Sequence, residues 1–109
     1  AVARAIVSTG LHPSMGLHHH NQYNSFCLAD DLLEPLRPAV DLKVYNQWEK
    51  SPDGLELTPE NKHALLEVLS VGCVINDQRL PVMSALHHYA ASVRRVICGE
   101  HKCVEIPVL

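Results

Sequence analysis

Apolar residues recur at helical spacing between Phe26 and Trp48, and this pattern predicts a long helical segment. The apolar positions of the segment are Leu28, Leu32, Leu33, Leu36, Val40 and Val44. Pro35 and Pro38 interrupt the pattern, and a proline inside a helix costs about 3 kcal/mol because it removes a hydrogen bond. We therefore expect either one kinked helix or two helical pieces that meet near positions 35–38.

A short stretch rich in alanine and valine opens the chain and predicts a helix over residues 1–8. Thr9 and Gly10 end it, since glycine readily adopts the left-handed conformation that closes a helix. Isolated helices need about 12 to 15 residues to be stable in water. We therefore expect this helix to be the second half of a longer one, and the chain to be a fragment.

The middle of the chain contains a turn and then a second helix start. The sequence Ser51-Pro52-Asp53-Gly54 is typical of a turn. Thr58 is expected to be the N-cap of the next helix, because Pro59 suits the first helical position. That helix is predicted to run to about Ser70.

The last third of the chain combines a hairpin with a helix. Short β-prone stretches at 73–75 and 79–82 flank the turn-forming pair Asn76-Asp77 and predict a β-hairpin. A final helix is expected over 83–97, ended by Gly99 and followed by an extended tail. The predicted fold class is mainly α, with one short β-hairpin.

Composition excludes some function classes. The chain has 109 residues, of which 47% are apolar, so it can bury a modest core. Its formal net charge is −3, whereas a self-contained DNA-binding domain usually carries a basic excess. Any positive surface for nucleic acid must then come from elsewhere. No apolar run approaches the roughly 18 residues of a membrane span, so a cytoplasmic location is expected.

The cysteines do not suggest a disulfide framework or a zinc ribbon. They are Cys27, Cys73, Cys98 and Cys103, without a Cys-x-x-Cys pair. Free thiols in a reducing cytosol are the expectation. His101 lies between the last two, but a metal site there has no evident fourth ligand.

A polar loop over residues 11–24 holds three consecutive histidines, His18 to His20. Asp31 and Glu34 follow it, three residues apart, and on a helix they share one face. Carboxylates beside an imidazole suit Mg²⁺ or Mn²⁺. In an extended loop His18 and His20 point roughly opposite to His19, so only one or two of the three can bind a single ion. Two simpler interpretations stay open: solvated loop histidines, and acids that complement the start of a helix.

Other polar residues have ordinary explanations. We expect Arg37 to pair with Glu34 or Asp41 rather than with a phosphate. The basic residues near the C-terminus are expected on a solvated helix face, and two histidines and three aromatic residues are expected to pack in the core or an interface. These residues are Arg94, Arg95, Lys102, His87, His88, Tyr23, Tyr45 and Trp48.

A long motif carries a resemblance to a known family. It consists of Gly16-Leu17-His18-His19-His20-Asn21, then Tyr23-Asn24, Phe26, Leu28, Asp31-Leu32-Leu33-Glu34-Pro35-Leu36-Arg37-Pro38 and Asp41. This order resembles the signature of the CRISPR-associated spacer-acquisition integrases, in the branch found with type II systems. The hairpin and closing helix also fit, so the resemblance covers nearly the whole chain.

The resemblance implies a site and a domain. Residues 1–109 would be the C-terminal part of a helical catalytic domain whose first part, with an N-terminal β-domain, is absent. His19 and Glu34 match the metal-ligating positions, and Asp31 matches an acidic position near the metal. A third ligand, a glutamate, lies upstream in the family and is absent from this chain.

The implied function is insertion of spacers into a CRISPR array by attack of a 3′-hydroxyl on a phosphodiester, with Mg²⁺ or Mn²⁺ as cofactor. The implied partners are DNA, a second copy in a homodimer and the second CRISPR adaptation protein, in the bacterial cytoplasm, with no membrane. The alternative is a non-catalytic helical module that binds a metal or a protein. An upstream glutamate would discriminate between these two functions.

Overall fold

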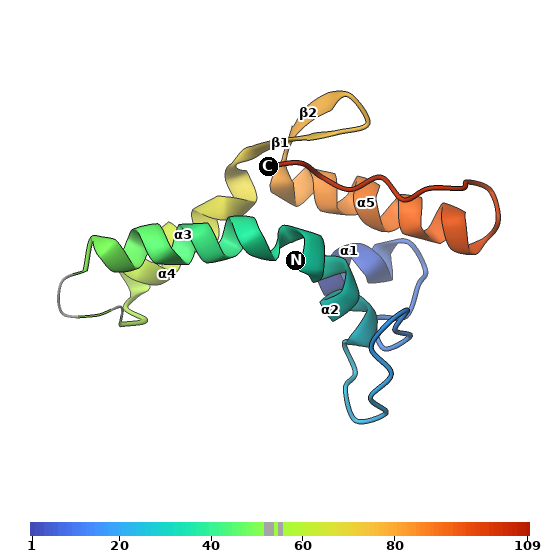
Figure 1. Cartoon of the computed structure of the whole chain (residues 1–109), viewed down its shortest axis with the longest axis horizontal. Helices are drawn as coiled ribbons and strands as arrows, with labels where there is room; N and C mark the ends of the chain where they lie inside the picture. The colour runs from blue at the N-terminus through green and yellow to red at the C-terminus, as the bar shows by residue number, and fades with distance from the viewer. Residues whose placement is uncertain (52–53, 55) are drawn as a thin grey trace.

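The chain folds into helices joined to one hairpin, and the computed structural model describes residues 1–51, 54 and 56–109 (Figure 1). The elements are α1 Val2–Ser8, α2 Cys27–Leu33, the 3-10 turn η1 Glu34–Leu36, α3 Arg37–Glu49, α4 Pro59–Leu66, the 3-10 turn η2 Glu67–Ser70, β1 Gly72–Ile75, β2 Gln78–Pro81 and α5 Val82–Ile97. The expected mainly α fold with one short hairpin is confirmed. None of the helices in the described ranges is both long and apolar enough to cross a bilayer.

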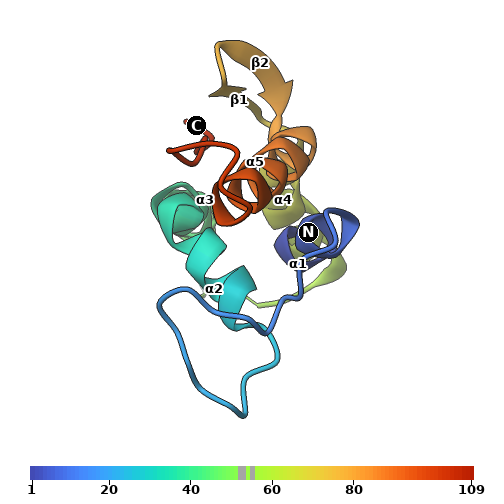
Figure 2. The same cartoon turned by 90° about the vertical axis from the view of Figure 1, so that its right-hand side faces the viewer.

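The hydrophobic core extends along α5, which packs against α1 and β1, and continues to α2, which packs against α1 (Figure 2). The buried apolar residues of α5 recur at spacings of three and four, as one face of a helix requires. They are Val82, Ala85, Leu86, Tyr89, Ala90 and Val93. Ile6 of α1, Leu28 of α2 and Cys73 of β1 are buried against this face. Burial of these side chains is the main source of stability for such a small domain.

The segment between Phe26 and Trp48 forms two helices, α2 and α3, which is one of the two arrangements expected from the sequence. Helix α2 ends at Leu33, η1 makes one tight turn, and α3 begins at Arg37. Pro35 and Pro38 each stand in the first positions of a new helical element, where a missing N–H is tolerated. The two prolines therefore divide the helix rather than bend it.

Only the first half of the apolar stripe faces the core. Leu28, Leu32 and Leu36 are buried, but Val40 and Val44 are exposed, and α3 has no buried residue. The physical reason is the change of direction at η1, which takes α3 away from the core to lie beside α4 (Figure 1). A hydrogen bond of 3.0 Å from Gln47 Nε2 to Asn61 Oδ1 connects α3 to α4.

Local signals set the boundaries of the other elements. Gly10 has a φ of +85° just after α1, and Thr58 accepts a hydrogen bond from the N–H of Asn61 at 3.2 Å, so the predicted C-cap and N-cap are confirmed. The turn predicted over 51–54 falls partly outside the described residues. Its two ends, Ser51 and Gly54, are described, and the Gly54 N–H donates to the Ser51 carbonyl oxygen at 3.0 Å.

The hairpin forms as predicted, and the C-terminal tail pairs with its strand β1. Asn76 and Asp77 have φ angles of 49° and 59°, the left-handed pair that a tight two-residue hairpin turn requires. On the other side of β1, Val108 of the tail exchanges two backbone hydrogen bonds with Val74, at 2.9 and 2.8 Å. The tail thus returns to the sheet, and it packs Val104 against the core on the way.

Candidate functional site

The Asp31 carboxylate organises the histidine loop. Its Oδ2 atom accepts hydrogen bonds from the backbone N–H groups of Leu17 at 2.6 Å and His18 at 2.9 Å. Its Oδ1 atom accepts from the His19 N–H at 3.2 Å and contacts the His19 ring at Nδ1, 2.5 Å away. One side chain on α2 therefore binds three consecutive residues of a loop that lies more than ten positions earlier in the sequence.

The pKa of Asp31 is set by two opposing effects. The side chain is only 8% exposed, and its burial raises the pKa. The hydrogen bonds from the His18 backbone, the His19 ring and the backbone of Leu17 and His19 lower it, and they outweigh burial. The pKa falls from 3.8 to about 2. Asp31 is therefore a carboxylate near neutral pH and can only accept hydrogen bonds.

An ionised Asp31 determines which nitrogen of His19 carries the proton. Since the carboxylate accepts, Nδ1 must donate, which leaves the Nε2 lone pair of a neutral ring free. Metal-binding histidines are usually held in this way, with a carboxylate on one ring nitrogen and the ion on the other. The His19 side chain is 42% exposed, so a ligand can reach it.

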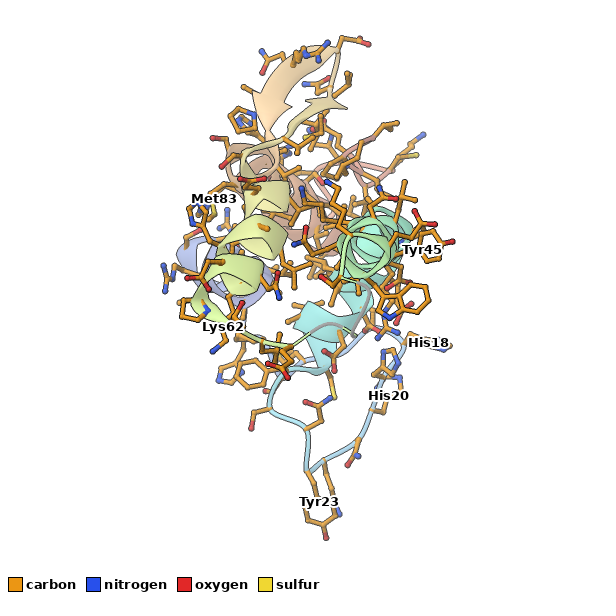
Figure 3. The ribbon with its side chains drawn as sticks, turned by 90° about the vertical axis from the view of Figure 1, so that its left-hand side faces the viewer. His18, His20, Tyr23, Tyr45, Lys62 and Met83 are labelled. Carbon is orange, nitrogen blue, oxygen red and sulfur yellow. The ribbon has the colours of Figure 1, made fainter. Side chains whose placement is uncertain are left out.

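The neighbouring histidines point differently from His19. His18 and His20 are exposed while His19 is half-buried, which is the alternation expected of an extended loop. Figure 3 shows His18 and His20 on the loop that extends from the helices toward Tyr23. The rings of His18 and His19 meet edge to face, with centroids 5.4 Å apart. His19 is thus the histidine of the triplet whose ring contacts Asp31.

Glu34 lies one turn after Asp31, in η1, and has a different partner. Its Oε1 atom is 3.3 Å from Arg37 Nε, so the expected salt bridge of Arg37 is confirmed, with Glu34 rather than Asp41. The Glu34 side chain is 48% exposed. Over the described ranges, no group of three or more histidine, cysteine, aspartate or glutamate side chains is placed to hold a metal ion.

Two groups of side chains that were expected in the core or an interface do not lie in the core. His87 and His88 were expected to pack, but both are exposed, because α5 turns Leu86, Tyr89 and Ala90 inward instead. Tyr23, Tyr45 and Trp48 do not lie in the core either; their exposed fractions are 87%, 52% and 54%. Tyr45 and Trp48 stand on α3, which the turn at η1 takes out of the core.

The remaining candidates lie near the end of the chain. His87 Nδ1 is 3.2 Å from the Ser8 hydroxyl oxygen, and Arg95 is 3.6 Å from Glu105. Arg94 and Lys102 are exposed, as expected of a solvated face.

All four cysteines are free thiols: Cys27 and Cys73 are buried, and Cys98 and Cys103 are exposed.

Sequence reasoning missed two residues that shape the site. Gly16 was noted only as the first residue of the motif, and Cys27 only as a thiol. In the structure the backbone at Gly16 lies against Cys27 and the His19 carbonyl group. Only the position of Gly16 just before the triplet hinted at a role, since contact across the loop cannot be deduced from spacing.

Two comparisons with known proteins identify the same family. The family model described as CRISPR associated protein Cas1 matches residues 1–67. The CRISPR-associated endonuclease Cas1 of Neisseria meningitidis serogroup C (strain 8013) is 38% identical over 108 residues, which is 98% of this chain and 36% of the relative. The chain thus spans about a third of the length of the curated relative that it matches.

Proposed function

Since the chain belongs to the family of CRISPR-associated protein Cas1, we propose that it forms part of a metal-dependent DNA endonuclease and integrase of CRISPR adaptation. The reaction proposed is attack of a spacer 3′-hydroxyl on a phosphodiester of the repeat. The observation that carries the proposal is the 2.5 Å contact between His19 Nδ1 and Asp31 Oδ1. It leaves the Nε2 lone pair of His19 free to bind an ion, on a half-exposed ring.

The residues of the site fit a divalent cation. His19 Nε2 and the Glu34 carboxylate would hold Mg²⁺ or Mn²⁺, a nitrogen and oxygen donor set that suits Mn²⁺ in particular. When bound, the ion would stabilise the negative charge that develops on phosphoryl oxygens. Glu34 is paired with Arg37 but half exposed, and an exposed ion pair contributes only about 0 to 1 kcal/mol. A metal can therefore replace Arg37 at small cost.

Asp31 has a separate role in this proposal. Its carboxylate is saturated by four N–H groups from residues 17–19, so little remains of it to bind an ion. We infer that it orients His19 and keeps the proton on Nδ1. Outer carboxylates of this kind typically contribute about 10- to 100-fold to metal affinity or activity.

The proposal also concerns the larger protein. We propose that residues 1–109 are the C-terminal part of a helical catalytic domain and that a further glutamate ligand and a β-domain are supplied from outside them. This is supported by the 36% coverage of the relative. The net charge of −3 fits the same proposal, because phosphate contacts then come mainly from elsewhere.

The partners belong to the same proposal. We propose that the protein acts in the bacterial cytoplasm on spacer DNA and the CRISPR repeat, as a homodimer and with the second CRISPR adaptation protein. The exposed apolar residues of α3, such as Leu42 at 59% and Trp48 at 54%, leave surface available for protein contacts.

A spacer-integration assay on the full-length protein tests the proposal. His19→Ala and Glu34→Ala should each abolish Mn²⁺-dependent integration, while the folded state persists because both side chains are partly exposed. His18→Ala and His20→Ala are the matched controls and should have milder effects, since His19 is the histidine whose side chain contacts Asp31. Equal losses at all three histidines would contradict the assignment of His19.

The alternative is a non-catalytic helical module that binds a metal or a protein. It is favoured if the full-length protein has no glutamate-bearing segment before Ala1, or if His19→Ala integrates normally. Isothermal titration with Mn²⁺, combined with the integration assay, distinguishes the two, since a metal-binding module would bind the ion without any DNA reaction.

A further inference from the structure

The histidine loop approaches α2 most closely at Gly16. A Cβ atom built on Gly16 would overlap the carbonyl oxygen of His19 and would lie 2.7 Å from Cys27 Cβ. Both approaches, to the His19 oxygen and to Cys27 Cβ, are closer than real contacts of a Cβ atom allow. Gly16 does not have a positive φ angle, unlike Gly10 and Gly99. The position therefore needs glycine for lack of space and not for backbone conformation.

Cys27 contacts the other limb of the same loop. Its side chain is 1% exposed, and its thiol is 3.4 Å from the carbonyl oxygen of Asn21 and 3.3 Å from that of Asn24, to which it donates. The next residue, Leu28, donates its N–H to the Pro13 carbonyl oxygen at 2.7 Å. Residues before and after the histidine triplet thus both rest on the first turn of α2.

Gly16 and Cys27 together fix the path of the loop between them. The segment 17–19 runs around the Asp31 carboxylate, with the His19 carbonyl group held against Gly16. The segment 21–24 is held by the Cys27 thiol. His19 lies between these two attachments, so a shift of either one moves its ring relative to Asp31.

We propose that Gly16 and Cys27 form a clamp that positions the His19 ring for its role in the reaction. They are positioning residues: neither would touch the metal or the DNA, and the Cys27 thiol is buried and engaged with backbone carbonyl groups. The effect of the clamp on integration rests on the proposed function, whereas its effect on the position of the His19 ring does not.

NMR spectroscopy of the 109-residue chain without metal tests the clamp. The variants are Gly16→Ala and Cys27→Ala. The readouts are the Nδ1–H proton signal of His19, shifted downfield by its hydrogen bond to Asp31, and the amide signals of residues 17–19. Core amides such as that of Val93 report whether the rest of the domain remains folded.

Two control variants separate positioning from general destabilisation. Gly72 also lacks a positive φ angle, and an added Cβ there meets only the Arg79 side chain, at 3.3 Å from Nε. Cys73 is as buried as Cys27, with exposed fractions of 2% and 1%, but it belongs to β1 and the core. Gly72→Ala and Cys73→Ala should leave the His19 signals in place.

The clamp predicts loss of the His19 Nδ1–H signal in Gly16→Ala and its weakening in Cys27→Ala, with core amides unchanged. Cys27→Ser keeps a donor toward Asn21 and Asn24 and should restore the signal. If Gly16→Ala retains the wild-type signals of residues 17–19, the clamp does not exist. Equal losses in Cys27→Ala and Cys73→Ala would overturn it as well.

A second measurement separates the clamp from the proposed function. In the full-length protein, Gly16→Ala should lower Mn²⁺-dependent integration about 10- to 100-fold, as loss of an outer contact to a metal ligand does. Gly72→Ala should not lower it. Loss of the His19 signal together with normal integration would support the clamp and contradict the role of His19 in the reaction.

Discussion

At the scale of single residues, the site depends on one buried carboxylate. Asp31 accepts hydrogen bonds from three successive backbone N–H groups and from the His19 ring. A buried carboxylate without such partners would be costly, so the loop and Asp31 stabilise each other. The same contacts select the His19 tautomer, which connects the stability of the loop to its chemistry.

The lowered pKa of Asp31 makes stability depend on pH. The unfolded chain binds a proton near pH 3.8 and the folded chain only near pH 2. Asp31 thus contributes stability that is fully present above about pH 4 and is lost as the pH falls toward 2, on the order of 1 kcal/mol. Urea denaturation of wild type and Asp31→Asn at pH 6 and pH 3 measures this. The difference between the two proteins should shrink at pH 3; a constant difference would contradict the assignment.

Asp31 and Glu34 should also differ in their response to metal. Glu34→Gln keeps the shape and removes a proposed ligand, so metal affinity and integration should be lost together. Asp31→Asn removes an orienting group, and activity should fall about 10- to 100-fold and recover partly at raised Mn²⁺. Integration by the full-length variants over a range of Mn²⁺ concentrations tests both. Survival of Glu34→Gln, with Asp31→Asn inactive at every concentration, would reverse the two roles.

At the scale of elements, tight turns decide where each helix and strand points. The 3-10 turn Glu34–Leu36 ends α2 at the edge of the core and sends α3 beside α4. The Asn76-Asp77 turn brings β2 back along β1, with Cys73 opposite Leu80 and Ile75 opposite Gln78. Since Cys73 and Ile75 are buried, this turn holds one side of the core in register.

The hairpin turn offers a direct test of backbone conformation. Asp77 has a φ of 59°, where a β-branched residue is strained and glycine is not. Asp77→Val should lower the free energy of unfolding by about 1 to 2 kcal/mol, whereas Asp77→Gly should not lower it. Urea denaturation of the two variants gives the comparison. Equal stability of both would show that the turn is not populated.

At the scale of the whole molecule, the described chain supplies only two of the proposed metal ligands. They are His19 and Glu34, and the described residues contain no group of three or more histidine, cysteine, aspartate or glutamate side chains placed to hold a metal ion. Apolar residues also remain exposed on α3, including Leu42 and Trp48. Both features fit a chain that spans 36% of its relative.

The 109-residue chain alone should therefore neither integrate nor cleave DNA efficiently. With fewer than three ligands, an ion would be bound weakly and positioned loosely. Incubation of the purified chain with labelled DNA and Mn²⁺ should yield no more product than His19→Ala does. Robust cleavage that a chelator abolishes would contradict this prediction.

The local elements followed from the sequence because local rules determine them. Thr58 and Pro59 start a helix, Gly10 and Gly99 follow helix ends, and Asn76-Asp77 makes a turn, whatever surrounds them. The residue types of the site were evident for a similar reason, because His19, Asp31 and Glu34 stand in one motif. Their roles are proposals that await the experiments above.

Contacts between distant positions were decided only by the tertiary structure. Spacing placed Asp31 and Glu34 on one face and Arg37 within reach of Glu34. Only the fold of the loop onto α2 brought the His19 ring to Asp31. The same holds for α3: Val40 and Val44 continue the helical spacing of the buried leucines, yet a change of direction at η1 exposes them. Periodicity determines which residues share a face; only packing determines what that face meets.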